Sequence, residues 1–479
     1  MPKRLIASAL LALPLVLTAC DMLGTRSDPD TSVEQARWSA DTVRQLRGAI
    51  DRRAGHGLDR MTFALDGRPG TAEGETALTR SALHYAAALA RGASDPVKLY
   101  KDYTLERAQV DLEGGLARAL AAGTVDEWLE SLAPQHASYR QLSKAYLALR
   151  GAGAAAPGPA IPDAAAPLKP GRTDARVPAI ARQLVASDYL DRAQAQGNRY
   201  NEAMVQAVRR MQADYGIAPD GIVGGGVIEI LNLSDADRAR AIAVALERLR
   251  WLEREPPATR IDVNIAAAQL SYWREGKIVD RRKVVVGKPG NETPQLGSPI
   301  YRLVANPTWT VPRSIERKEI ADKDEAYLRR NNMAWQDGWI VQQPGPQNSL
   351  GLVKFDMKND HQIYLHDTPA KALFDEVQRQ RSHGCVRVDD ALGFAELLAR
   401  DEGVLDAWNR ARASGEESFV PLPREIPVRL FYQTVLLDEA GEPVIRADPY
   451  GWNERVAVAL GFPAREDMRF HPSTSDVGP

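Results

Sequence analysis

A change of hydrophobic period near residue 260 constrains the fold of this chain most. Before it, apolar residues recur at helical spacing, as at Val43, Leu46 and Ile50, which indicates helices with one buried face. From Ile261 onward, apolar and polar residues alternate in short runs, which is typical of half-buried strands. The sequence therefore predicts a multidomain α+β protein, with α-helical parts first and a mostly-β domain after them.

A segment without any period divides the helical part. Residues 151–174 run GAGAAAPGPAIPDAAAPLKPGRTD, and this Ala/Pro/Gly composition is typical of a semi-extended linker. We therefore predict a helical scaffold domain at 33–150, a linker at 151–174 and a small three-helix domain at 175–234.

The mostly-β domain is predicted at 258–450. Its expected strands are Val284–Gly287, Leu303–Val304, Val353–Phe355, Ile363–Leu365 and those within Val428–Leu436.

An insertion at about 312–347 is charged and partly helical, shows no strand pattern, and carries Trp335 and Trp339. Insertions of this length are often lids over a site; the alternative is a structural excursion with both tryptophans packed in the core. Residues 451–479 are expected to form an uninformative C-terminal tail.

The N-terminus has the pattern of an export signal. Lys3 and Arg4 precede an apolar run at 5–17, too short for a bilayer span of about 20 residues. The following Ala19-Cys20 completes a stretch that resembles a bacterial lipobox. We predict a signal peptide at 1–19, lipidation of Cys20 and a tether at 20–32, with a plain signal peptide as the alternative.

The expected location is therefore the periplasm or cell envelope, with the chain anchored to a membrane by lipid. Asp21 follows the predicted lipid site, a position that favours the inner membrane in enterobacterial lipoproteins.

The chain contains two cysteines. If Cys20 is lipidated, Cys385 has no disulfide partner within the chain, and a lone exported thiol suggests a chemical role. The net charge of −2 comes from charges spread along the chain, so no nucleic-acid partner is expected. No cofactor or metal motif is apparent, and none is predicted.

The residues around Cys385 supply what a thiol nucleophile needs. A free cysteine has a pKa near ~8.5, so it needs a base, and His383 and His366 lie 2 and 19 residues before it. Gly384 allows a tight backbone path, so the Cys385 amide could face a developing oxyanion. This pattern predicts nucleophilic acyl transfer.

His366, a gap of 15 residues and then Ser382-His383-Gly384-Cys385-Val386-Arg387 resemble the signature of the L,D-transpeptidase (YkuD-like) family. Further stretches resemble its large, multidomain Gram-negative members: Arg248–Leu252, Val284–Pro289, Asn306–Trp309, Pro344–Gly351 and His366–Pro369. Within 175–234, a second set resembles a three-helix peptidoglycan-binding domain: Met211-Gln212, Tyr215-Gly216-Ile217, Asp220-Gly221 and Gly224. Met211 stands at that family's Phe and Val227 at its Thr, so glycan binding by this copy is open.

The resemblance implies a reaction on peptidoglycan stem peptides. Cys385 would attack a tetrapeptide donor and release D-alanine, and His366 would be the general base, oriented by the backbone carbonyl near Asp367. The amine of an acceptor stem, typically diaminopimelate, would then resolve the thioester and complete a 3→3 cross-link. Carbapenems, known inhibitors of the family, would acylate the same thiol.

The resemblance also assigns supporting roles. Tyr364 and the Gly384–Cys385 backbone would stabilise the oxyanion, Arg387 and Ser382 would bind substrate, and His383 would support the site by hydrogen bonding. His383 as the base remains an alternative.

Four other interpretations remain open. His366, His383 and Cys385 could be zinc ligands. The protein could be a non-catalytic peptidoglycan-binding lipoprotein, an L,D-carboxypeptidase or lipoprotein-attaching variant, or a cysteine peptidase of another fold.

Overall fold

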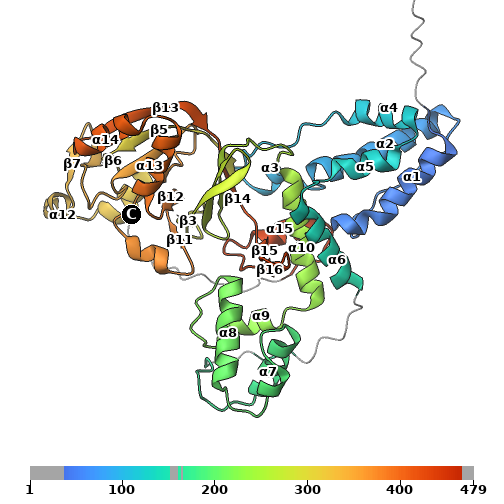
Figure 1. The fold of residues 1–479 in the computed structure, drawn as a ribbon, viewed down its shortest axis with the longest axis horizontal. Coiled ribbons are helices and arrows are strands. Elements are labelled where there is room, and N and C mark those ends of the chain that lie inside the picture. The colour runs from blue at the N-terminus through green and yellow to red at the C-terminus, as the bar shows by residue number, and fades with distance from the viewer. Residues whose placement is uncertain (1–36, 152–159, 163–165, 466–479) are drawn as a thin grey trace, which may run out of the picture. The chain divides into compact units, whose positions relative to one another are not determined.

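A computed structural model describes residues 37–151, 160–162 and 166–465 (Figure 1). The predicted signal peptide, the lipidation of Cys20 and the tether lie outside these residues. Helices precede a mostly-β domain, as the change of period predicts, so the multidomain α+β class is confirmed. Among the described residues, no helix is long and apolar enough to cross a bilayer.

Capped amphipathic helices form the first part of the described chain. Ser39 and Ser234 each close a capping box, in which a side chain satisfies otherwise free amides of the first turn. The helices are α1 (Ala40–Asp51), α2 (Ala72–Arg91), α3 (Pro96–Leu99), α4 (Leu112–Ala122), α5 (Val125–Leu132), α6 (Ala137–Gly151) and, later in the chain, α10 (Asp235–Trp251).

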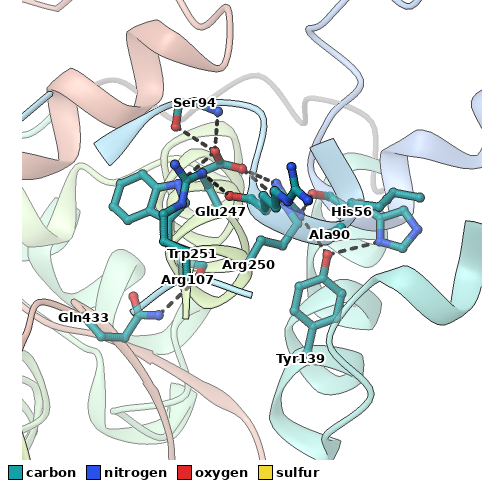
Figure 2. Close-up of polar contacts among 12 residues, drawn as sticks. His56, Ala90, Ser94, Arg107, Tyr139, Glu247, Arg250, Trp251 and Gln433 are labelled. Atoms are coloured by element: carbon teal, nitrogen blue, oxygen red, sulfur yellow. Dashed lines mark hydrogen bonds and ion pairs between the residues drawn. The ribbon is translucent and has the colours of Figure 1, made fainter. Parts of the chain in front are cut away.

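A buried polar network joins α10 to the N-terminal helices. Figure 2 shows the Glu247 carboxylate between Ser94 and Arg250, with Tyr139 beyond the arginine. Glu247 Oε1 accepts from the Ser94 amide and hydroxyl, both at 2.6 Å, and Oε2 accepts from Arg250 Nη2 at 2.6 Å. Arg250 Nη1 donates to the Tyr139 hydroxyl at 2.7 Å. Both charged side chains are 0% exposed, so each depends on the other to offset the loss of water.

The small domain consists of α7 (Val177–Ala186), α8 (Glu202–Tyr215) and α9 (Gly225–Leu231), with a core of its own. The predicted linker is partly wrong. Ile161 and Leu168 are buried in that core, Ile161 bonds Asn232 through both backbone groups, and Leu168 pairs with Val223. Apolar side chains at these positions make this part of the segment pack instead of remaining solvated.

The β domain is built on one curled sheet with the strand order β13-β5-β9-β10-β12-β3-β2-β1-β14-β4, and β11 pairs with β3. Helices α13 (Ala391–Asp401) and α14 (Leu405–Ala413) follow β12. The strands are β1 (Arg260–Asn264), β2 (Gln269–Arg274), β3 (Lys277–Gly287), β4 (Leu296–Gly297), β5 (Ile300–Ala305), β9 (Val353–Met357), β10 (Leu365–His366), β11 (Gln380–Ser382), β12 (Val386–Val388), β13 (Ser418–Ile426) and β14 (Val428–Phe431).

The insertion at about 312–347 is not devoid of strands, so that prediction is wrong. Strands β7 (Met333–Gln336) and β8 (Trp339–Gln342) form a hairpin, and β8 also pairs with β6 (Trp309–Thr310). The helical part comprises α11 (Arg313–Ile315), a π-helical turn (Glu316–Ile320) and α12 (Glu325–Arg330). We call residues 312–347 the lid.

The lid tryptophans are not packed in the core, contrary to the alternative interpretation. Trp335 is 57% exposed and Trp339 is 39% exposed. The Arg313 guanidinium lies 3.9 Å from the centre of the Trp339 ring. A small apolar core, separate from the main core, instead packs Ile320 and Ile340 of the lid against Trp309 of β6.

The predicted tail is also wrong for the residues that the structure describes. After the hairpin β15 (Val435–Leu437) and β16 (Pro443–Ile445), helix α15 (Trp452–Ala459) forms. Trp452, Val456 and Leu460 are buried in the main core. Their spacing of four residues is the signal for an amphipathic helix.

Candidate active site

Six of the predicted site residues line a cleft of about 650 Å³ between the sheet and the lid: Tyr364, His366, Ser382, His383, Cys385 and Arg387. Gly384 and Asp367 are adjacent in sequence to lining residues but do not line the cleft themselves. Strand β10 pairs in parallel with β12, in a register that sets His366 beside Arg387. The Val386 amide donates to the Tyr364 carbonyl at 3.1 Å. Tyr364 and Cys385, which directly precede these two strands, therefore lie at the same edge of the sheet.

His366 is held as a neutral base. Its Nδ1 lies 2.5 Å from the Asp367 carbonyl oxygen. Because a carbonyl can only accept, Nδ1 carries the proton and Nε2 has a free lone pair. Burial lowers the pKa of His366 to about 3, helped by the positive charge of Arg387 and opposed by the Asp367 contact. The ring is therefore uncharged at neutral pH and can take a proton.

The carbonyl that orients His366 is itself anchored. The Asp367 amide donates to Val353 O at 2.9 Å, and its carboxylate accepts from the Leu352 amide at 2.9 Å and pairs with Lys371. Gly351 has φ +62°, and a Cβ there would collide with the Asp367 carboxylate. This packing gives Asp367 a supporting position through its backbone and its side chain.

Cys385 lies partly exposed on the cleft floor as a protonated thiol. Its Sγ donates to the Gln362 carbonyl at 3.6 Å. Burial of the thiol raises its pKa, while hydrogen bonds from Tyr364 and the charges of Lys354 and Arg387 oppose the rise. The thiol therefore needs a base to become nucleophilic. Gln362 was missed from sequence; its φ of +56° marks a backbone constraint that the residue type does not show.

Tyr364 can donate a hydrogen bond throughout the physiological range. Burial raises the pKa of its hydroxyl well above the ordinary value, and the nearby Cys385 raises it further. Its ring lies 5.7 Å from that of His366, and Lys354 Nζ lies 4.3 Å from its centre. A neutral phenol beside the thiol has the chemistry required of an oxyanion donor.

The Ser382 hydroxyl shapes the loop before β12. It donates to the Cys385 carbonyl at 2.6 Å and accepts from the Gly384 amide at 3.2 Å. Gly384 has φ +120°, a backbone conformation open to glycine. The Ser382 side chain therefore holds the backbone on both sides of Cys385, and its contact with substrate stays a prediction.

Arg387 lies buried below the site, with 2% exposure. Its charge acts on both His366 and Cys385, and its binding of a substrate carboxylate stays a prediction.

Two cationic side chains that the sequence analysis missed are more accessible than Arg387. Lys354 Nζ and Arg302 Nε contact the Asp356 carboxylate at 2.7 and 2.6 Å. We call Arg302, Lys354 and Asp356 the charge cluster; one formal positive charge remains on it after pairing.

His383 connects the site to the lid. Its Nε2 lies 2.7 Å from Glu319 Oε1 of the lid's π-helical turn. This contact was missed from sequence because the two residues are far apart along the chain. Among the described residues, no group of three or more His, Cys, Asp or Glu side chains is arranged to hold a metal ion. The structure thus does not bring His366, His383 and Cys385 together as zinc ligands.

Comparison with known proteins identifies the β domain. Residues 258–409 match the family model of the L,D-transpeptidase catalytic domain (YkuD). The chain carries a YkuD-family L,D-transpeptidase catalytic domain. Residues 33–145 match a scaffold domain, and residues 173–231 match a domain described as "Putative peptidoglycan binding domain". The resemblance to large multidomain members is thereby confirmed.

Individual relatives are distant. A curated Haemophilus influenzae protein, "Putative L,D-transpeptidase", is 30% identical over 223 residues, which cover 42% of this chain and 45% of the relative. The chain thus matches less than half the length of that relative. A solved L,D-transpeptidase of Stackebrandtia nassauensis is 13% identical, with 56% of this chain and 95% of that chain covered and a TM-score of 0.24. One of Xylanimonas cellulosilytica is 16% identical, with 56% and 100% covered and a TM-score of 0.20.

Proposed function

We propose that this protein is an envelope L,D-transpeptidase that forms 3→3 cross-links between peptidoglycan stem peptides. The observation that supports this most is the presence of a neutral, oriented His366 and a protonated Cys385 in one cleft at the same edge of the sheet. Neither group alone is reactive at neutral pH. Together they supply a base and a nucleophile whose charges appear only during the reaction.

The proposed first half-reaction makes a thioester. His366 Nε2 takes the Cys385 proton as sulfur attacks the carbonyl of the third residue of a donor tetrapeptide. The resulting oxyanion accepts hydrogen bonds from the Cys385 amide and the Tyr364 hydroxyl. Collapse of the intermediate breaks the bond to D-alanine, and His366 returns the proton to the leaving nitrogen.

The second half-reaction transfers the acyl group. An amine of a diaminopimelate acceptor attacks the thioester and loses its proton to His366, and the thiolate leaves and is reprotonated. The charge cluster suits a donor with free carboxylates, because Arg302 and Lys354 line the cleft beside Tyr364.

The envelope location rests on the N-terminal pattern. Residues 1–19 are proposed to direct export and Cys20 to carry the lipid that tethers the enzyme to a membrane. The 173–231 domain is proposed to hold the enzyme on its polymeric substrate, which raises the local concentration of stem peptides.

The test is mass spectrometry of a disaccharide-tetrapeptide incubated with residues 21–479, beside Cys385→Ala. A dimer lacking one D-alanine, made by the wild type alone, is expected. Tripeptide without dimer would replace the proposal with an L,D-carboxypeptidase or a different acceptor. No product, together with a thiol that resists imipenem, would favour a non-catalytic peptidoglycan-binding protein.

A further inference from the structure

We propose that Thr293 and Tyr450 are positioning residues, which fix the peptide between Gly384 and Cys385 so that the Cys385 amide points at the oxyanion. The inference rests on the proposed function of Cys385. Neither residue belongs to the motif that surrounds the nucleophile, and Tyr450 lies beyond the matched catalytic domain, which ends at residue 409.

Four hydrogen bonds form a closed arrangement under the nucleophile loop. The Gly287 amide donates to Thr293 Oγ1 at 2.8 Å, and Thr293 Oγ1 donates to the Gly384 carbonyl at 2.7 Å. The Thr293 amide donates to the Tyr450 hydroxyl at 3.3 Å, and that hydroxyl donates to the Gly287 carbonyl at 2.5 Å.

The direction of every proton in this arrangement is fixed. Backbone amides only donate and carbonyls only accept. The Thr293 hydroxyl already accepts from Gly287, so its own proton must go to Gly384. The Tyr450 hydroxyl likewise accepts from Thr293 and donates to Gly287.

Peptide planarity carries this constraint to the reacting centre. In a trans peptide, the carbonyl of one residue and the amide of the next point in opposite directions. Holding the Gly384 carbonyl on Thr293 therefore turns the Cys385 N–H away from Thr293. Gly384 needs this restraint because its φ of +120° belongs to a residue with wide backbone freedom.

The surroundings keep the support rigid. Thr293 is 0% exposed, and a Cβ on Gly287 would lie 2.6 Å from the Thr293 amide nitrogen, so the two segments approach as only glycine allows. The Tyr450 ring stacks on Tyr432 with centroids 5.4 Å apart and meets Trp452 edge-on at 4.9 Å. The Tyr450 amide donates to the Tyr432 hydroxyl at 3.1 Å.

Two reactions of the same thiol separate positioning from folding. Acylation by imipenem proceeds through an oxyanion, whereas alkylation by iodoacetamide displaces iodide without one. Thr293→Val keeps the side-chain shape and removes the hydroxyl. It is expected to slow acylation about 10- to 100-fold. This decrease is no larger than the decrease that follows the loss of an oxyanion donor itself. The alkylation rate and its pH profile should stay unchanged.

Matched variants complete the test. Thr293→Ser retains the hydroxyl and should restore most of the acylation rate, and Tyr450→Phe should give an intermediate, acylation-specific loss. Tyr272→Phe also removes a buried tyrosine hydroxyl, one that bonds Asp401 at 3.1 Å away from this loop, and should leave both rates unchanged.

Three outcomes would overturn the proposal: unchanged acylation in Thr293→Val, equal loss of acylation and alkylation, or no rescue by Thr293→Ser. A wild-type protein that iodoacetamide alkylates but imipenem does not acylate, and that makes no cross-linked product, would instead overturn the proposed function on which this inference rests.

Discussion

The rate at which Cys385 is acylated at acidic pH tests whether His366 is the buried, neutral base. With a pKa of about 3, about 99% of the imidazole remains neutral at pH 5. An ordinary histidine of pKa ~6.5 would be only about 3% neutral there. The rate of acylation by imipenem should therefore fall little between pH 7 and pH 5, where an ordinary histidine base of pKa ~6.5 would cause a fall of about 25-fold. The sign follows from burial, which disfavours the charged ring and moves protonation to lower pH.

Stopped-flow measurement of acylation across this range, corrected for hydrolysis of free imipenem, checks the expectation. His366→Gln should lower the rate by at least about 100-fold at every pH, as loss of a general base does. His383→Gln should leave the pH dependence of the acylation rate as in the wild type, because His383 pairs with Glu319 of the lid. If the acylation rate of the wild type fell with a midpoint near pH 6.5, the argument from burial would be refuted. If that fall disappeared in His383→Gln, His383 would be the base.

Three further perturbations have expected outcomes. Glu247→Gln should lower the free energy of unfolding by about 3 kcal/mol or more in urea titrations, because Arg250 would keep an unpaired buried charge; a cost below about 1 kcal/mol, typical of exposed pairs, would contradict this. Arg302→Gln should raise KM for the donor about fivefold while kcat changes little, and the effect should vanish for a donor with amidated carboxylates. Glu319→Gln should speed hydrogen exchange of the lid's amides, since the 2.7 Å ionic contact with His383 is lost; unchanged exchange would show that this contact does not restrain the lid.

The fold could be predicted where local pattern decides it. The helical spacing of Val43, Leu46 and Ile50 correctly predicted α1, and the alternation from Ile261 correctly predicted β1, since both patterns reflect which faces are buried. The errors lie where tertiary contacts decide. Strand β10 is confined to Leu365–His366, so Ile363 lies outside it, and Val428–Leu436 is split between β14 and β15.

The lid hairpin was missed because its strands carry an unusual pattern. Three of the four residues of β7 are exposed, and the lid packs in a small core separate from the main core. Alternation between a buried and an exposed face is the signal by which a strand is found, and a strand that lacks it gives little signal of its own. Helix α15 had a usable signal in its buried positions, but the Gly- and Pro-containing stretch before it obscured it.

The site shows the same division. Gly384 and Cys385 were predicted because thiol chemistry requires those residue types, whereas His366 was assigned as the base by its resemblance to the family signature. Lys354 and Glu319 carry no such mark, because each becomes relevant only through a pairing of distant segments: β9 beside β10, and the lid beside the nucleophile loop.

Support for the nucleophile comes from segments that the motif does not include. Tyr450 reaches the loop through Thr293, and Trp452 packs 4.8 Å from the ring of Tyr100, whose hydroxyl donates to the Trp452 carbonyl at 3.3 Å. Tyr100 directly follows α3 and so belongs to the N-terminal helical part. The same part is joined to α10 by the hydrogen bonds of Glu247 and Arg250. In the proposed mechanism the reacting residues are thus few and local, whereas the residues proposed to hold the Gly384–Cys385 peptide in place contact segments on both sides of the catalytic domain. An isolated 258–409 segment would retain Cys385 and His366 but lose Tyr450, so the part of the chain that matches the catalytic-domain model lacks one of the residues that we propose to position the Cys385 amide.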